Sequence, residues 1–128
     1  MFRRAFGLTA AAAIIAFSFG GIAQAGETQV KADDIVKTLS GNTIVGVWSG
    51  SHYKQYFGED GSTMYIAEGS PPSPGKWRAN PETNMYESWW EQTGWTPYSI
   101  VDTDDGLAWV SGGALHHFEV MDGKQISW

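Results

Sequence analysis

Residues 75–100 read GKWRANPETNMYESWWEQTGWTPYSI, and this stretch decides the fold. It predicts two strands joined by a tight turn at residues 80–84, then a connection centred on Gly94 that leads into a third strand. An asparagine opens such a turn by bonding to the nearby backbone, a proline pre-sets the next φ angle, and Asn84 accepts the left-handed conformation. Four of the seven tryptophans lie here. Because large aromatic residues dominate core energetics, we expect the core to close around this segment.

Short strands are predicted on both sides of this segment. From Thr43 onward the sequence alternates with a period of two, which indicates half-buried strands. Asp-Gly and Gly-Gly pairs separate most of the strands and favour tight hairpins, because those turns need positive φ angles. The loop at residues 69–75 contains three prolines, and we do not expect it to pair in a sheet. The expected strands are 43–48, 51–57, 62–67, 75–79, 85–90, 96–102, 107–111, 114–121 and 124–128.

One short helix precedes the strands. Residues 33–40 begin with two acids, carry a lysine near the end, and present an apolar stripe of Ile35, Val36 and Leu39. Gly41 is the expected stop. One helix and many hairpin-connected strands predict a mainly β protein, an antiparallel meander that closes as a small up-and-down, calycin-like β-barrel with the N-terminal helix at one end. A two-sheet sandwich is the alternative.

Residues 1–25 predict export. A basic start, an apolar run over residues 10–19 and the sequence Ala-Gln-Ala at 23–25 are the three parts of a secretory signal peptide. We therefore expect cleavage before Gly26, a single β-rich domain over residues 26–128, and a periplasmic or secreted location in a bacterium. The alternative is an uncleaved anchor, but the apolar run is short for a bilayer. No membrane insertion is expected after cleavage.

The composition argues against several classes of function. The chain has 14 acidic and 8 basic residues and a formal net charge of −6. An acidic chain lacks the basic patch that attracts nucleic acid or anionic membranes, so we expect neither as a partner. The chain contains no cysteine, which excludes thiol catalysis, thiolate metal sites and disulfides. We expect aromatic packing in their place. No residue pattern indicates a cofactor or an oligomeric state.

Several short motifs resemble one protein family. They are Leu39-Ser40-Gly41-Asn42-Thr43, Tyr53 followed by Tyr56-Phe57 and Asp60-Gly61, and Gly75-Lys76-Trp77-Arg78. In this order they resemble the small exported bacterial proteins catalogued as domain of unknown function 995, over most of the chain after residue 25. The family's pattern carries a cysteine pair after the Gly-x-Trp motif, where this chain has Met85 and the Gly94-Trp95 region. The resemblance implies an exported β-domain and no particular mechanism, because the family has no established activity.

The histidines do not predict a metal site. His116 and His117 are neighbours on one expected strand, so their side chains point to opposite faces and do not chelate one ion together. His117 shares a face with Glu119, and His52 approaches them only if the fold brings it there. Common metal geometries need three or four converging ligands, so we expect these residues to be ordinary polar strand positions.

Glu87 is the carboxylate for which two roles are open. It shares one strand face with Trp89, whereas Ser88 and Trp90 share the other. Alternation does not show which face is buried, because each face carries a tryptophan. If the face of Glu87 is interior, Glu87 is a buried carboxylate with a raised pKa and a candidate general acid. If it is exterior, Glu87 is a surface acid, which we favour because acids are rarely buried unless paired. No catalytic motif is present, so we assign no catalytic residue.

The candidate binding residues are Trp89, Trp90, Trp95, Tyr98 and Glu87. They fall on a loop and strand end beside amide and hydroxyl groups. Flat rings near polar groups are typical of sites for sugars, lipid tails or aromatic small molecules in the mouth of a barrel. The alternative is that these rings form the core of a domain without disulfides. Trp95, flanked by small residues, is the ring that we expect to be exposed.

We hypothesise an exported, non-catalytic β-domain that binds a small or envelope-derived ligand through an aromatic-lined opening. One alternative is a structural or protein-interaction module of the cell envelope that acts through an edge strand or the proline loop. Another is a hydrolase built on Glu87 or Glu91. A pocket would support the first hypothesis, a long uncovered edge strand the second, and two facing carboxylates in one cleft the third.

Overall fold

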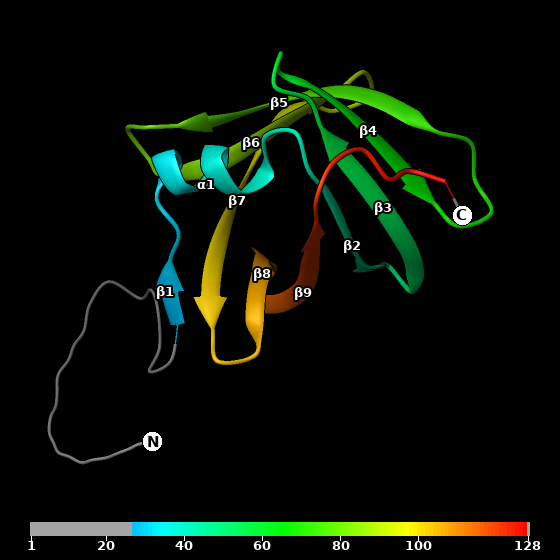
Figure 1. Ribbon diagram of the computed structural model, residues 1–128. Helices are drawn as coiled ribbons and strands as arrows, with labels where there is room; N and C mark the ends of the chain where they lie inside the picture. The colour runs from blue at the N-terminus through cyan, green and yellow to red at the C-terminus, as the bar shows by residue number, and fades with distance from the viewer. Residues whose placement is uncertain (1–26, 128) are drawn as a thin grey trace, which may run out of the picture.

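A closed barrel of eight antiparallel strands forms the body of the protein (Figure 1). The computed structural model describes residues 27–127. Their elements are β1 (Glu27–Gln29), α1 (Ala32–Leu39), β2 (Thr43–Trp48), β3 (Ser51–Phe57), β4 (Ser62–Ala67), β5 (Ser73–Asn80), β6 (Met85–Trp90), β7 (Gly94–Thr103), β8 (Gly106–Ser111) and β9 (Ala114–Met121). Strands β2 to β9 pair in chain order, and β9 pairs with β2 to close the barrel. The predicted meander barrel is confirmed, and the sandwich alternative is wrong.

Five strands, β2, β3, β4, β6 and β9, have the predicted bounds. Strand β5 begins earlier than expected, inside the proline-rich loop, which corrects the expectation that residues 69–75 do not pair. Ser73, Pro74 and Gly75 pair with β4. Pairing with β6 starts only at Lys76. Pro74 therefore has β4 alone as a neighbour, so its missing N–H breaks no hydrogen bond to β6.

The expected strand at residues 124–128 is wrong for the residues that the structure describes, since 124–127 are irregular. The reason is that β2 already pairs with β3 on one side and with β9 on the other, so no edge is open beside it. The segment is instead fixed by one buried hydroxyl. The Oγ1 of Thr43 donates to the carbonyl of Gly123 at 2.7 Å and accepts from the Gln125 amide at 2.9 Å.

Strand β1 was not predicted, because Glu-Thr-Gln shows no alternation of polar and apolar residues. It is formed by a tertiary contact. Strand β6 pairs with residues 94–98 of β7, whereas β1 pairs with residues 101–103. The three residues of β1 thus extend the sheet beyond the barrel, next to the end of β7.

The helix begins one residue before the predicted start. Asn84, in the turn between β5 and β6, has a φ of 57° as expected, and its Oδ1 accepts a hydrogen bond from the Ala32 amide at 2.9 Å. This cap comes from 52 residues away, so local sequence does not reveal it. Ile35 and Leu39 are fully buried, but Val36 is 44% exposed and does not belong to the apolar stripe.

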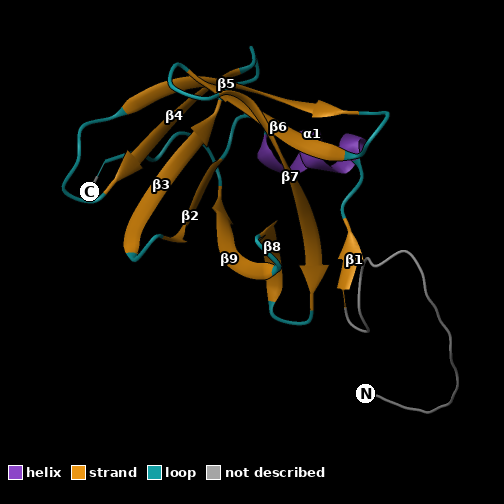
Figure 2. Cartoon of the chain, turned by 180° about the vertical axis from the view of Figure 1, so that it is seen from behind, coloured by secondary structure: helices purple, strands orange, loops and turns teal. Residues whose placement is uncertain are grey.

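The core lies where α1 covers one end of the barrel, under β5 and β6 (Figures 1 and 2). Trp77 is its central ring from the 75–100 segment and is 6% exposed. Trp77 packs on Phe57 with 5.4 Å between ring centroids, and its Nε1 donates to the Gly58 carbonyl at 2.9 Å. The core cluster comprises Ile35, Leu39, Ile44, Tyr53, Phe57, Trp77, Tyr86, Ile100, Trp109 and Phe118.

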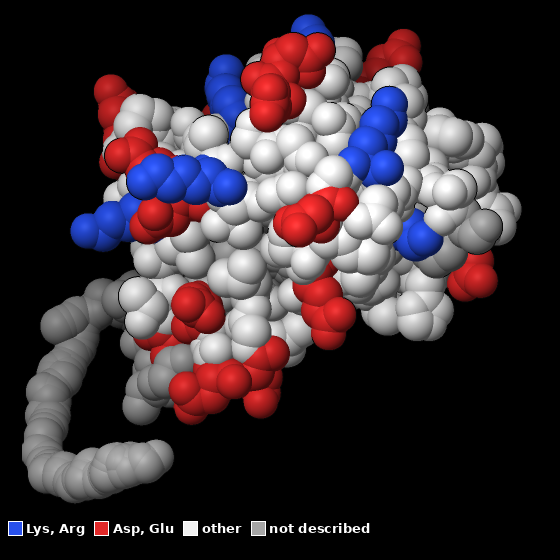
Figure 3. Space-filling model, in the orientation of Figure 1, with Lys and Arg blue, Asp and Glu red and all other residues white. Residues whose placement is uncertain are grey.

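The predicted signal segment lies outside the described residues, so export stays a prediction. Over residues 27–127, no helix has the length and apolar character needed to span a membrane. On the face shown in Figure 3, Lys and Arg side chains lie among Asp and Glu in the upper part, whereas the lower part carries acidic side chains, and no extended basic patch is visible.

Candidate ligand-binding cavity

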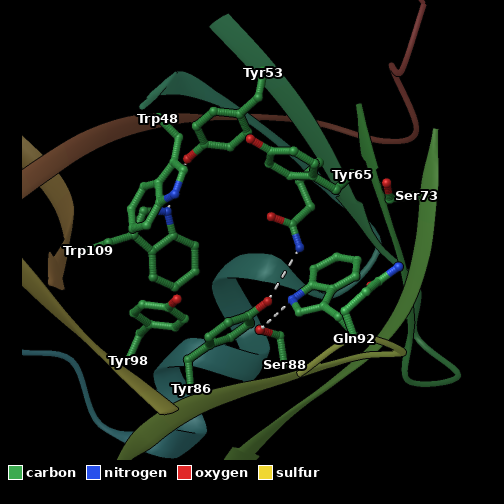
Figure 4. Close-up of a pocket in the computed structure, with 11 residues that line it drawn as sticks. Trp48, Tyr53, Tyr65, Ser73, Tyr86, Ser88, Gln92, Tyr98 and Trp109 are labelled. Carbon is green, nitrogen blue, oxygen red and sulfur yellow. Dashed lines mark hydrogen bonds between the residues drawn. The ribbon is translucent and has the colours of Figure 1, made fainter. Parts of the chain in front are cut away.

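A cavity of about 310 Å³ occupies the part of the barrel remote from α1. Trp90, which lines the cavity, ends β6, whereas Asn84, which caps α1, directly precedes the start of β6. The cavity is open to solvent, and Figure 4 shows the space that its side chains enclose. Its lining is Trp48, Tyr53, Gln55, Tyr65, Ser73, Tyr86, Ser88, Trp90, Gln92, Tyr98 and Trp109.

Strand alternation explains why so many rings point inward. On β6, Tyr86, Ser88 and Trp90 face the barrel interior, and the residues between them face outward. The same alternation brings Tyr53 and Gln55 inward on β3. The barrel interior is therefore lined by every second residue of these strands.

The aromatic rings form two arcs around the cavity. In Figure 4, Trp48, Trp109 and Tyr98 lie along one side, and Tyr65 lies on the other. In the first arc the centroid distances are 6.0 Å for Trp48–Tyr98, 6.2 Å for Tyr98–Trp109 and 4.7 Å for Trp109–Tyr86. In the second they are 5.2 Å for Tyr53–Tyr65 and 6.2 Å for Tyr65–Trp90. The Nε1 of Trp109 donates to the Tyr53 hydroxyl at 3.1 Å and joins the arcs.

Glycine makes room for two of these rings. A Cβ on Gly75 would lie 2.6 Å from the Trp90 ring, and one on Gly46 would lie 3.1 Å from the Tyr53 ring and hydroxyl. Neither glycine has a positive φ angle. The absence of a side chain, rather than backbone conformation, is therefore what these positions require.

Hydrogen bonds connect the polar groups that line the cavity. The Nε2 of Gln55 donates to the Thr63 Oγ1 at 2.9 Å and to the Tyr86 hydroxyl at 3.3 Å. The Trp90 Nε1 donates to the Ser88 Oγ at 3.2 Å. Figure 4 marks the contacts to Tyr86 and Ser88 as dashed lines. These bonds fix the orientation of the rings before any ligand arrives, which lowers the entropic cost of binding.

The cavity is electrically neutral. No Asp, Glu, Lys, Arg or His is among its lining residues. Burial raises the pKa of Tyr53 to about 12, although the hydrogen bond from Trp109 opposes this shift. Burial also raises the pKa values of Tyr86 and Tyr65 above their ordinary value. These phenols remain uncharged at physiological pH.

The structure brings only two of the sequence-predicted residues, Trp90 and Tyr98, into the cavity. Trp89, Trp95 and Glu87 lie on the outer face of the barrel. There the guanidinium carbon of Arg78 lies 3.8 Å from the centroid of Trp95, which is 40% exposed, and the Lys76 ammonium lies 4.9 Å from that of Trp89. The expected exposure of Trp95 is thus observed, but away from the cavity.

Glu87 lies on the outer face, where its side chain is 14% exposed and forms an ion pair. Its Oε1 accepts a hydrogen bond from the Arg78 Nε at 2.6 Å, and its Oε2 accepts one from the Asn80 Nδ2 at 3.2 Å. The Arg78 contact, followed by that from Asn80, lowers the pKa of Glu87. A general acid needs the opposite shift. The buried, raised-pKa alternative is therefore wrong.

The other nine lining residues were missed. Trp48, Tyr53, Tyr65 and Trp109 lie on strands far apart in sequence, and only the barrel closure brings them together. The usable signal was the alternation within one strand: once Trp90 is placed inside, Ser88 and Tyr86 on the same strand face inward with it.

Among residues 27–127, no group of three or more His, Cys, Asp or Glu is arranged to hold a metal ion. Comparison with known proteins found no matching family model, curated protein or solved structure. The resemblance to domain of unknown function 995 stays a prediction.

Proposed function

We propose that this protein is an exported, non-catalytic binding domain that holds a small neutral ligand inside its barrel. The observation that carries the proposal is the open cavity of about 310 Å³, in which seven of the eleven lining residues are aromatic and none is charged. Largely preformed pockets with apolar walls and a few placed polar groups are the usual form of small-molecule sites.

The volume limits the size of the ligand. A water molecule occupies about 30 Å³ of liquid, so the cavity has room for roughly ten non-hydrogen atoms if it is filled completely. This suits a one-ring or two-ring molecule and excludes a polymer, except for an end or a side group that enters the mouth.

The lining also limits the charge of the ligand. A buried ion needs an opposite charge or several hydrogen bonds to offset its lost hydration. The cavity offers neither an acid nor a base. Its ring faces and edges favour stacked and edge-on contacts with a flat or cyclic neutral molecule.

The two alternatives draw less support. The eight barrel strands pair on both sides, so the only strand edge beyond the barrel among the described residues is that of the three-residue β1. The described residues therefore contain no long uncovered strand edge at which another protein could dock. The hydrolase hypothesis, built on Glu87 or Glu91, needs facing carboxylates in one cleft, and the cavity lining contains no carboxylate. The exported location is part of the proposal and rests on the sequence of residues 1–25 alone.

The proposal is tested by thermal unfolding with two para-substituted toluenes, the neutral p-cresol and the anionic p-toluate. Only the neutral cresol is expected to raise the melting temperature. A ligand at about 100 times its Kd adds about 2.7 kcal/mol to the free energy of unfolding. Trp95→Ala, on the outer face, serves as the matched control and should respond as the wild type does. Equal effects of the two probes, or no effect of cresol up to its solubility, would contradict the proposal.

A further inference from the structure

We propose that Gln55 selects the ligand, and that its Oε1 accepts a hydrogen bond from an N–H or O–H group on the edge of a neutral aromatic ring. The ligand class is thereby narrowed to neutral aromatic donors such as indoles and phenols. This inference rests on the proposed function and deepens it.

Gln55 is buried at the edge of the cavity. It lies in the middle of β3, is 5% exposed, and lines the cavity. A glutamine in such a place must satisfy two donors and one acceptor without much help from bulk water. Its two N–H groups are both accounted for, by Thr63 Oγ1 and the Tyr86 hydroxyl.

The orientation of the amide is fixed by a neighbouring hydroxyl. Thr63 donates its own hydroxyl hydrogen to the carbonyl of Tyr56 at 2.8 Å. Its oxygen therefore acts as an acceptor toward Gln55, and the amide atom that faces it is the nitrogen. A flipped amide would place two acceptors against each other. The carbonyl oxygen of Gln55 is consequently turned away from Thr63.

The Gln55 Oε1 is left without a partner. No residue of the 27–127 segment donates a hydrogen bond to it, although the side chain is almost wholly buried. Buried polar groups in proteins are nearly always paired with protein or ordered water, so this acceptor is available to a donor group that enters the cavity. The indole donors nearby are already used, because Trp109 bonds to Tyr53 and Trp90 bonds to Ser88.

The surrounding rings define the rest of the ligand. Tyr86 accepts from the Gln55 amide, and Trp109 packs on Tyr86 at 4.7 Å between centroids. A flat ring that enters between the two aromatic arcs can stack on them and direct one edge donor at the Gln55 carbonyl. A site that must pair a buried polar group rejects an analogue without the donor more strongly than it rejects a change of size.

The test compares indole with benzofuran, which has the same two-ring shape but an oxygen in place of the N–H. Calorimetric titration of the wild-type protein should give a Kd for indole at least tenfold lower than for benzofuran. Equal or tighter binding of benzofuran would overturn the role of the acceptor while leaving cavity binding intact. If neither probe binds, the proposed function fails together with this inference.

Two variants assign the effect to Gln55. Gln55→Met keeps the length of the side chain and removes the acceptor, so the ratio of the two Kd values should fall to about one through weaker indole binding. Gln125→Met, at an exposed glutamine that does not line the cavity, should leave the ratio unchanged. A tenfold preference that persists in Gln55→Met would refute the assignment.

If Gln55→Met does not fold, the wild-type protein still decides the assignment. Carbon-13 NMR of the Gln55 side-chain carbonyl should show a shift with indole and none with benzofuran. The same response to both probes would refute the proposal.

Discussion

Strands β6 and β7 carry aromatic residues on both faces, and the two faces differ in what surrounds the rings. On the inner face, Trp90 and Tyr98 line a cavity that contains no charged side chain. On the outer face, Trp89 and Trp95 pair across the same two strands and lie beneath the cations of Lys76 and Arg78. The residue types are alike, but their partners are not.

The difference shows that an aromatic residue is not by itself a sign of a binding site. The outer rings already have cationic partners and solvent, and such cation–π contacts need no further ligand. The inner rings pack edge-on and tilted against one another around a space that no side chain fills. The proposed site is therefore defined by the cavity between the inner rings and not by the presence of aromatic residues.

The largest effect is expected where the inner face is fully packed. Trp77→Ala removes a 6% exposed ring and its hydrogen bond to Gly58. It should lower the free energy of unfolding by about 3–5 kcal/mol, the usual range for truncating a large buried aromatic residue. Urea denaturation measures the loss. A loss below about 1 kcal/mol would mean that Trp77 does not belong to the core.

A smaller effect is expected at the cavity wall. Gly75→Ala places a methyl group 2.6 Å from both the Trp89 carbonyl and the Trp90 ring, so it should displace the neighbouring strand and that ring. The free energy of unfolding should fall by about 1–3 kcal/mol, as in other overpacked cores. Cresol binding should weaken at the same time. Because Gly75 has no positive φ angle, crowding rather than backbone strain is tested. Unchanged stability and unchanged cresol affinity would show that Gly75 is not closely packed against the cavity lining.

The outer ion pair should respond to pH. The hydrogen bond from Arg78 lowers the pKa of Glu87 in the folded state. The stability that this ion pair contributes is therefore present above the unfolded pKa of about 4.3, and it is lost as the pH falls through the folded pKa. Glu87→Gln should cost at most about 1 kcal/mol at pH 7, since Arg78 is largely exposed. The cost should diminish below the unfolded pKa and vanish once the pH lies below the lowered folded pKa of Glu87. A cost that grows on acidification would reverse the assigned sign.

The smallest effect is expected at Trp95. Trp95→Ala should change the free energy of unfolding by less than about 0.5 kcal/mol, because the ring is 40% exposed on the outer face. Cresol affinity should stay the same, since Trp95 does not line the cavity. Titration of the variant beside the wild type checks both. A clear loss of affinity would place the binding surface on the outer face.

Much of the fold was predictable because turn chemistry and alternation are local. Five strands have the predicted bounds, because turn residues such as Asp60-Gly61 and Gly112-Gly113 and the alternation between turns are both local. Asn84 also adopts the expected left-handed conformation. The cap that Asn84 gives to α1 and the pairing of β1 with β7 were not predictable, since each depends on a partner distant in the chain.

The site was much less predictable than the fold, for a different reason. Trp89 and Trp90 are adjacent, so each face of β6 carries one tryptophan and hydrophobicity does not tell which face is inside. Small neighbours indicated that Trp95 is exposed, but exposure to solvent and access to a cavity are different properties. Gln55 gave no local signal, because its significance lies in Thr63 and Tyr86.

The most direct test of the central claim is a crystal structure of the protein soaked with 5-bromoindole. Anomalous scattering from bromine locates the probe without ambiguity. We expect one strong bromine peak inside the barrel, between the two aromatic arcs, with the probe nitrogen in hydrogen-bonding distance of the Gln55 Oε1. Bromine found only at the outer rings of Trp89 and Trp95, or an empty cavity at saturating probe, would contradict the account.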